Sequence, residues 1–376
     1  MKILFTGGGT GGHIFPIIAI IRELKAISQG SDLDLFFIGP KHEIYSSHLE
    51  NEGVIVKNVL TGKIRRYFNV KSFFSNIIDV LFRVPVGIIQ SFFHIFLISP
   101  DVIFSKGGHG ALPATIAGFL LGTPIFLHES DAAPGATNRF LSKFAIEIFT
   151  AFPSEKTEFF PADKMISIGN PLRSEILNGS ESQAKEMFHL TGEKSVILIL
   201  GGSQGSQRIN DIVLQALSDI LKNFELIHQV GINNFKEVES ESKIVIDKNL
   251  IKYYHILPFL NQEELANALR IADLVISRAG SGSIFEIAAL AKPSILIPLP
   301  ESAQNHQVKN AYIYAENGAC KVLEESNLAP HFFLDRIEYL FSHTDNLEAM
   351  KYKAKDFSKP YAAKIIASYL LEYLRQ

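Results

Sequence analysis

Glycine-rich segments occur at four places where a short apolar run gives way to a helical pattern. They span residues 7–13 (GGGTGGH), 105–110 (SKGGHG), 201–206 (GGSQGS) and 278–283 (RAGSGS). Glycine lets backbone N–H groups approach a phosphate closely, and a helix that starts there adds partial positive charge. Four such turns therefore predict a protein that handles more than one phosphate group.

The apolar runs before these turns have the length and composition of buried parallel strands. They alternate with helix-period segments, which is the rhythm of an α/β fold, and the rhythm restarts near residue 195. We expect two doubly wound domains. Asn170-Pro171 is a turn signal, so the expected domains are 1–168 and 169–351, with a helix over 352–376 that packs back on the first. Ligands of such sheets bind at the carboxyl ends of the strands, where all four turns lie.

Two common phosphate-binding classes fit the sequence poorly. Gly7, Gly9 and Gly12 match G-x-G-x-x-G, but a dinucleotide site also needs an acid at the end of the second strand. That strand ends at Gly39-Pro40, and its acids stand at its start. No P-loop lysine pattern is present, which disfavours an ATPase or GTPase. The remaining alternative for any single turn is a tight loop without a ligand.

Composition narrows the class of protein further. The chain has 376 residues, a formal net charge of −3 and a single cysteine, Cys320. These values give no case for nucleic-acid binding or for a disulfide framework. The N-terminus lacks the apolar run of a signal peptide. The longest uncharged apolar stretch, Val84 to Ser99, is shorter than the ~20 residues of a spanning helix. We therefore expect no transmembrane segment and interpret that stretch as core.

Two side chains are candidates for proton transfer. His13 closes the first glycine turn, and a histidine pKa near 6.5 suits a general base. His13 could instead hold the loop or bind an acceptor phosphate. Glu129, with His128, follows a strand end and is an alternative base or an orienting group. Asp32-Leu33-Asp34 lies at the wrong end of its strand for a metal–diphosphate site, so we expect no metal.

A basic and aromatic segment lies between Lys57 and Arg83. It carries six basic residues and one acid, interleaved with Tyr, Phe, Ile and Leu. Basic residues beside bulky apolar ones suit an anionic membrane surface, at about 1 kcal/mol per base. The alternative is a buried helix with a solvated charged rim.

The ordered motifs resemble one known family over nearly the whole chain. They are GGGTGGHIFP at 7–16, GGHGALP at 107–113, HES at 128–130, GNPLR at 169–173, GGSQG at 201–205, SRAG at 277–280 and HQ at 306–307. The chain resembles the MurG-type transferases of glycosyltransferase family 28. These add N-acetylglucosamine from UDP-N-acetylglucosamine to undecaprenyl-diphosphate-linked N-acetylmuramyl-pentapeptide at the cytoplasmic face of the bacterial membrane.

The resemblance implies the GT-B fold, in which two Rossmann-like domains face a cleft. It also implies inversion at the sugar and no cofactor. The donor residues that it implies are Thr10, Gly11, Gly12, Asp131, Arg173, Ser203, Leu260, Ser281, Gly282, Ser283, Glu286, His306, Gln307 and Asn310. The turn of Gly107, Gly108, His109 and Gly110 would bind the acceptor diphosphate. Asp131 stands where the family often has Asn.

Two other functions remain open from the residues. One is a UDP-sugar transferase of the same fold that acts on a different lipid or natural-product acceptor. The other is a non-catalytic protein that binds a nucleotide sugar or a lipid diphosphate. A pure binding protein would need neither a base such as His13 nor a second anion turn such as 107–110.

Overall fold

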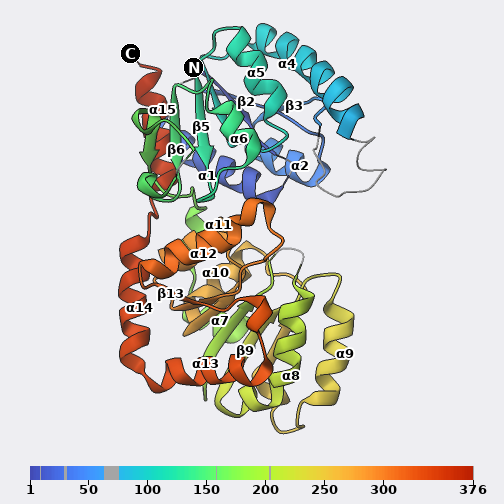
Figure 1. Cartoon of the computed structure of the whole chain (residues 1–376), viewed down its shortest axis with the longest axis vertical. Helices are drawn as coiled ribbons and strands as arrows, with labels where there is room; N and C mark the ends of the chain where they lie inside the picture. Colours follow the sequence, from blue (N-terminus) through green and yellow to red (C-terminus); the bar gives the residue numbers. More distant parts are fainter. Residues whose placement is uncertain (9, 29–31, 63–75, 158, 203–204, 376) are drawn as a thin grey trace. The chain divides into compact units, whose positions relative to one another are not determined.

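A computed structural model describes residues 1–8, 10–28, 32–62, 76–157, 159–202 and 205–375. The chain forms two compact units, Met1–Arg173 with Pro360–Gln376, and Ser174–Lys359. Each unit is an α/β domain with its own parallel sheet, as the alternating pattern predicts (Figure 1).

The first unit is built on a seven-stranded sheet among its described residues, with strand order β3-β2-β1-β4-β5-β6-β7. The order reverses between β1 and β4, and a reversal of this kind marks the ligand-binding edge of a doubly wound sheet. The strands are β1 Lys2–Thr6, β2 Asp34–Gly39, β3 Ile55–Asn58, β4 Val102–Ser105, β5 Ile125–Glu129, β6 Glu147–Thr150 and β7 Met165–Ser167. Its helices are α1 Gly11–Ser28, α2 Glu43–Asn51, η1 Asp79–Arg83, α4 Val84–Ile98, α5 Leu112–Leu120, α6 Ala136–Leu141 and α15 Ala362–Tyr373, with short turns η2 Ser154–Lys156 and η3 Ala162–Lys164.

The second unit repeats this plan with six strands among its described residues, in the order β10-β9-β8-β11-β12-β13. Its reversal lies between β8 and β11. The strands are β8 Ser195–Leu200, β9 Phe224–Gln229, β10 Tyr254–Leu257, β11 Leu274–Ser277, β12 Ser294–Leu296 and β13 Cys320–Val322. Its helices are η4 Ser174–Asn178, α7 Glu181–Met187, α8 Gln207–Asn223, α9 Phe235–Val245, η5 Ile251–Tyr253, α10 Gln262–Ile271, α11 Ser281–Ala289, η6 Ala303–Asn305, α12 His306–Glu316, η7 Glu325–Asn327, α13 Pro330–Ser342 and α14 Thr344–Phe357.

The units divide later than the Asn170-Pro171 turn suggests, after Arg173. The reason is that the segment is tied back to β5. The carbonyl of Gly169 accepts a hydrogen bond from His128 Nε2 at 3.0 Å, and the Asn170 side chain accepts one from Ser130 at 3.3 Å. A strand-to-turn connection held by buried polar contacts stays with the sheet that supplies them.

The C-terminal residues form two helices rather than the single helix expected over 352–376. Helix α14 ends at Phe357 within the second unit, and α15 belongs to the first unit (Figure 1). Ala363, Ile366 and Leu370 of α15 join the core around α1, and Tyr369 packs edge-on against Phe149. The apolar periodicity of α15 therefore serves the first sheet, although it follows the second domain in the chain.

The interpretation of Val84–Ser99 as core is wrong, because most of helix α4 is not buried. A helical segment runs from Asn76 to Ile98, and only 22% of its most apolar window is buried. By length and composition it could cross a membrane, which the sequence argument missed because Asp79 and Arg83 interrupt the apolar run. Large apolar side chains of this segment are 36–78% exposed, namely Ile77, Ile78, Val80, Leu81, Phe82, Val86, Ile89, Phe93, Phe96 and Leu97.

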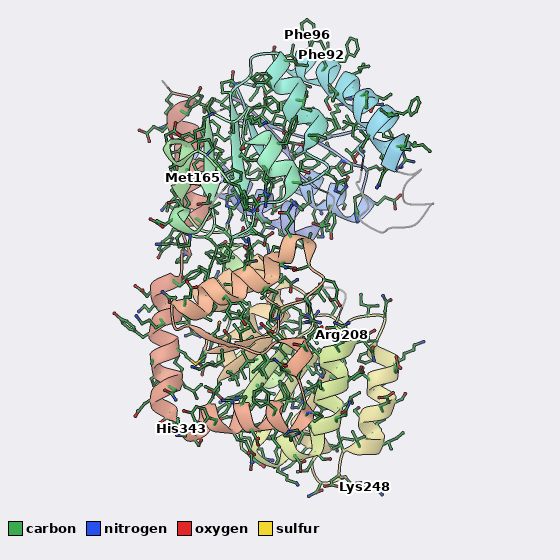
Figure 2. The ribbon with its side chains drawn as sticks, viewed as in Figure 1. Phe92, Phe96, Met165, Arg208, Lys248 and His343 are labelled. Atoms are coloured by element: carbon green, nitrogen blue, oxygen red, sulfur yellow. The ribbon has the colours of Figure 1, made fainter. Side chains whose placement is uncertain are left out.

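The opposite face of α4 packs on the first unit. Gly87, Ser91, Ile95 and Ile98 are buried. A Cβ on Gly87 would lie 1.9 Å from the carbonyl oxygen of Leu60, so only glycine permits this close approach. Figure 2 shows Phe96 pointing outward from this helix. An apolar surface of this size on one face of a packed helix is typical of an interaction site.

Candidate active site

Most predicted site residues of the first unit lie at the carboxyl ends of β1, β4 and β5. Helix α1 starts at Gly11, directly after the first glycine turn, and the backbone N–H of Lys106 donates to Thr6 at 2.8 Å. This bond holds the turns after β1 and β4 side by side. His13 lies between them, since a Cβ on Gly8 would be 3.0 Å from its Nδ1 and one on Gly108 would be 2.8 Å from its Nε2.

The environment of His13 differs from the one expected for an unperturbed histidine. Loss of hydration, together with the positive charges of Lys106 and His109, lowers its pKa to about 3. The ring is therefore neutral at neutral pH and carries a free lone pair, although it is a weak base in the enzyme without substrate. Its Nδ1 lies 2.7 Å from the Thr10 hydroxyl. The tautomer that donates from Nδ1 to Thr10 leaves the Nε2 lone pair beside Gly108 as the basic position.

Lys106 is a buried cation that the sequence analysis did not single out. Its ammonium group lies 2.9 Å from His128 Nδ1 and also donates to Ser130 Oγ. Burial lowers its pKa to about 8, against the raising effect of Glu129 and Asp131. Because an ammonium group can only donate, His128 accepts at Nδ1 and donates from Nε2 to Gly169. Its position between a predicted strand and a Gly-Gly turn is the sequence feature that could have identified Lys106 as a candidate site residue.

Glu129 lies at the end of β5 and is 4% exposed. Its Oε1 accepts from the backbone N–H of Asp131 at 2.9 Å, and its Oε2 accepts from Asn138 Nδ2 at 2.8 Å. Burial raises its pKa to about 7, helped by the charge of Asp131 and opposed by these hydrogen bonds and Lys106. Asn138 was also missed, because nothing in a single helical Asn distinguishes it in sequence.

This raised pKa predicts how stability depends on pH. The carboxyl takes up a proton on folding, so its contribution to stability is present below pH 4.5 and is lost as pH rises through about 7. Glu129→Gln is neutral throughout. Its thermal midpoint should therefore rise relative to wild type as pH increases from 4.5 to 7, in thermal unfolding scans across that range. A pH-independent difference would contradict the raised pKa, and exposed Glu348→Gln is the matched control.

The glycines of these turns fall into two groups. Gly107 has φ +78°, and a Cβ there would lie 1.8 Å from Asn138 Oδ1, while one on Gly110 would lie 2.4 Å from the Gly7 carbonyl oxygen. Internal packing explains these two positions. Among the described residues, no atom would lie within 4 Å of a Cβ on Gly12 or Gly282, so these residues leave space beside both helix starts.

The second unit places its predicted residues at the matching edge. Helix α11 begins at Ser281 after the N-cap residue Gly280, which has no side chain. The first backbone N–H groups of a helix point along its axis, so those of Ser281, Gly282 and Ser283 are oriented to bind an anion. Glu286 follows in the same helix and is partly exposed. Ser203 lies outside the described residues.

The loop before α12 positions the remaining donor candidates. Gln307 Oε1 accepts from the backbone N–H of Leu299 at 3.0 Å, and His306 Nδ1 lies 2.8 Å from the Ala303 carbonyl oxygen. Asn310 is fully buried and donates to the Ala279 carbonyl at 3.3 Å. That bond links α12 to the turn after β11, so packing accounts for Asn310 without a sugar contact.

Two other predicted donor residues belong to other segments of the chain. Leu260 is buried in the connection between β10 and the capping box of α10. Arg173 belongs to the first unit, where its guanidinium carbon lies 4.3 Å from the ring centre of Phe15. A cavity of about 420 Å³ between β13 and α13 contains none of the predicted residues.

Comparison with known proteins identifies the family. Residues 3–150 match the glycosyltransferase family 28 N-terminal domain, and residues 196–366 match the family's C-terminal domain. The chain is 36% identical, over 99% of both chains, to a Bacillus cereus protein named UDP-N-acetylglucosamine–N-acetylmuramyl-(pentapeptide) pyrophosphoryl-undecaprenol N-acetylglucosamine transferase 2. It is 34% identical to a Clostridium tetani transferase of the same name without the numeral, over 92% of this chain and 91% of the relative.

Solved structures support the fold. The crystal structure of Acinetobacter baumannii MurG has a TM-score of 0.75 at 24% identity, covering 99% of each chain. A Neisseria meningitidis UDP-GlcNAc 2-epimerase bound to UDP-GlcNAc has a TM-score of 0.70 at 16% identity. The GT-B expectation is thereby confirmed. With both family models matched and full-length relatives above 30% identity, the chain belongs to glycosyltransferase family 28 and is a glycosyltransferase.

Proposed function

We propose that this enzyme transfers N-acetylglucosamine from UDP-N-acetylglucosamine to the C4 hydroxyl of undecaprenyl-diphosphate-linked N-acetylmuramyl-pentapeptide. The observation that carries the proposal is the 36% identity over 99% of both chains to a relative named for this transfer. The open, anion-ready helix starts at Gly12 and Gly282 support it, because the donor and the acceptor both carry a diphosphate.

In the proposed reaction the acceptor oxygen attacks C1 of the sugar while the bond from C1 to the UDP oxygen breaks. Attack from the opposite side inverts the anomeric centre. The acceptor proton goes to His13 Nε2, and UDP leaves with the electron pair. Negative charge on the leaving diphosphate is stabilised by backbone N–H groups of Ser281, Gly282 and Ser283 and by the start of α11.

The acceptor diphosphate is assigned to the turn at Gly107, Gly108, His109 and Gly110. Two groups near this turn suit an anion. Lys106, which is buried at the start of the turn, supplies a positive charge, and the neighbouring His13 supplies a protonatable ring. An anionic acceptor would oppose the part of the lowering of the His13 pKa that comes from the positive charges of Lys106 and His109, and so make the ring a stronger base when substrate is bound. We assign Glu129 to orienting this edge, since both its carboxylate oxygens already accept hydrogen bonds.

The proposal includes peripheral binding at the cytoplasmic face of the cell membrane through the exposed face of α4. The buried residues Gly87, Ser91 and Ile95 favour a helix that lies on the lipid over one that spans it, because spanning would break their packing. Of the basic segment predicted from sequence, Lys57 and Arg83 are described and exposed, and residues 63–75 lie outside the described residues.

The experiment is a transfer assay with purified protein, radiolabelled UDP-N-acetylglucosamine and the lipid-linked acceptor. Labelled disaccharide-lipid is the expected product, and UDP-glucose is the matched donor control. Transfer to another lipid or to a natural-product acceptor, with none to the muramyl lipid, would replace this function by the alternative transferase. UDP binding without transfer to any of these acceptors would indicate a binding protein.

A further inference from the structure

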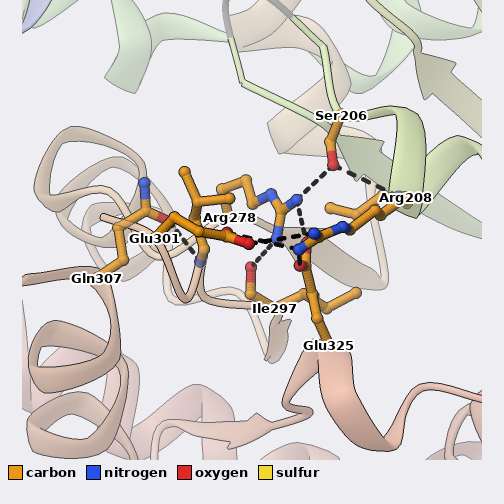
Figure 3. Close-up of polar contacts among 9 residues, drawn as sticks. Ser206, Arg208, Arg278, Ile297, Glu301, Gln307 and Glu325 are labelled. Carbon is orange, nitrogen blue, oxygen red and sulfur yellow. Dashed lines mark hydrogen bonds and ion pairs between the residues drawn. The ribbon is translucent and has the colours of Figure 1, made fainter. Parts of the chain in front are cut away.

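The carboxylate of Glu325 lies between two arginines of the second unit. Glu325 begins η7, the short turn after β13, and its side chain is 4% exposed. Oε1 pairs with Arg278, and Oε2 pairs with Arg208 (Figure 3). No resemblance or glycine motif pointed to Glu325, since it follows an edge strand that the sequence analysis did not predict.

Each arginine also contacts a residue outside the loop that carries Glu325. Arg278 donates to the carbonyl oxygen of Ile297 at 3.1 Å and to Ser206 Oγ, which caps α8. Arg208 pairs with Glu301 at 3.1 Å. Figure 3 shows these side chains converging on Glu325. The network thus joins the loops that follow β8, β11, β12 and β13, which are neighbours in the sheet.

These loops carry the proposed donor residues. Arg278 precedes the N-terminus of α11, where Ser281 begins the anion-ready turn. The loop with Ile297 and Glu301 leads to Gln307. A guanidinium group presents several N–H donors in a rigid plane, so its partners are fixed in relative position. One buried carboxylate that holds two such groups can set the spacing of all four loops.

We propose that Glu325 is a positioning residue for the sugar-nucleotide donor, acting through Arg278 and Arg208 on the turns that bind the nucleotide diphosphate. The inference rests on the proposed function. Without the carboxylate, two guanidinium groups stand close together with no common counter-ion, and repulsion moves the turns apart. Misplacement of binding groups by about 1 Å can cost up to ~100-fold.

The test compares Glu325→Gln with Glu225→Gln. Glu225 is a fully buried carboxylate near the amino end of β9, bonded to Thr191 and His255, and it serves as the matched control in the same sheet. Both variants should lose thermal stability. Only Glu325→Gln should weaken UDP binding in calorimetry and raise the donor KM, by about 10–100-fold, while the acceptor KM stays within about twofold.

Equal UDP affinity in Glu325→Gln and wild type overturns the proposal, as does an equal loss in both variants. If Glu325→Gln does not fold, UDP binding to Arg208→Gln tests the proposal instead. Its side chain is 58% exposed, and Glu325 keeps Arg278 as a partner. Weaker UDP binding supports the proposal, and unchanged binding overturns it. Failure of the proposed function is distinguishable, because it appears as absent transfer in the wild type.

Discussion

His13→Ala should lower turnover by roughly 10²–10⁴-fold while UDP affinity stays near the wild-type value. The imidazole lies between the turns after β1 and β4, with Nδ1 2.7 Å from the Thr10 hydroxyl and Nε2 beside Gly108. Alanine removes the proton acceptor but leaves the helix start and the second-unit turns unchanged. Steady-state kinetics with the lipid acceptor and UDP calorimetry measure the two effects.

Near-normal turnover in His13→Ala would exclude the base role. The exposed histidine His331, in the first turn of α13, provides the matched control, and His331→Ala should retain wild-type turnover. His13→Gln separates the remaining alternatives. It keeps a hydrogen-bonding group beside Thr10 but cannot take the proton, so a merely loop-holding histidine would be rescued by glutamine and a base would not.

The low pKa of His13 adds a second expectation for the free enzyme. Since its pKa is about 3, lowering pH from 7 to 5 does not protonate this histidine. The profile of kcat/KM against pH should therefore show no loss assignable to His13 in that range. A limb near 6.5 that disappears in His13→Gln would show that the ring titrates normally.

Phe93→Ser/Phe96→Ser should reduce binding to anionic vesicles by roughly 100-fold. The two rings are 60% and 64% exposed on α4, so they contribute little to the core. Inserting both into the lipid interface is worth about 3 kcal/mol, which corresponds to that change in the partition coefficient. Flotation with vesicles of phosphatidylglycerol and phosphatidylcholine measures it, with the thermal midpoint as a check on folding.

Ile244→Ser/Ile251→Ser is the matched control, because these side chains are 84% and 50% exposed in the second unit. It should bind vesicles like the wild type. Replacing the anionic lipid by phosphatidylcholine alone should weaken wild-type binding, as expected for Lys57 and Arg83 near the surface. Undiminished binding of Phe93→Ser/Phe96→Ser would remove α4 from the membrane interface.

Much of the fold was predictable because local patterns and tertiary structure agree. The apolar runs that precede the four glycine-rich segments were predicted to be strands, and they form β1, β4, β8 and β11. Each of the four runs is largely apolar and is followed by a glycine-rich turn. This combination is typical of a buried parallel strand. The edge strands β3 and β13 were missed, since the runs that form them are short and only partly buried.

Taken alone, the sequence determined the two-domain α/β class, the four anion-ready turns and the family resemblance. These depend on short-range features, namely glycine at strand ends and the order of motifs along the chain. Tertiary structure decided which groups meet. It placed Lys106 against His128 and Glu129 between Asp131 and Asn138, and it set their pKa values through burial.

The exposure of α4 and the partners of Glu325 were also decided by the tertiary structure and not by local sequence. An apolar run predicts burial equally well in a core or in a membrane, and only the packed structure shows that the described residues leave one face of α4 exposed. The pairing of Glu325 with Arg278 and Arg208 joins residues far apart in the chain, because parallel strands bring their carboxyl ends to one edge. Local sequence determines which backbone and side-chain groups each turn presents, whereas burial and long-range contacts determine which partners those groups meet.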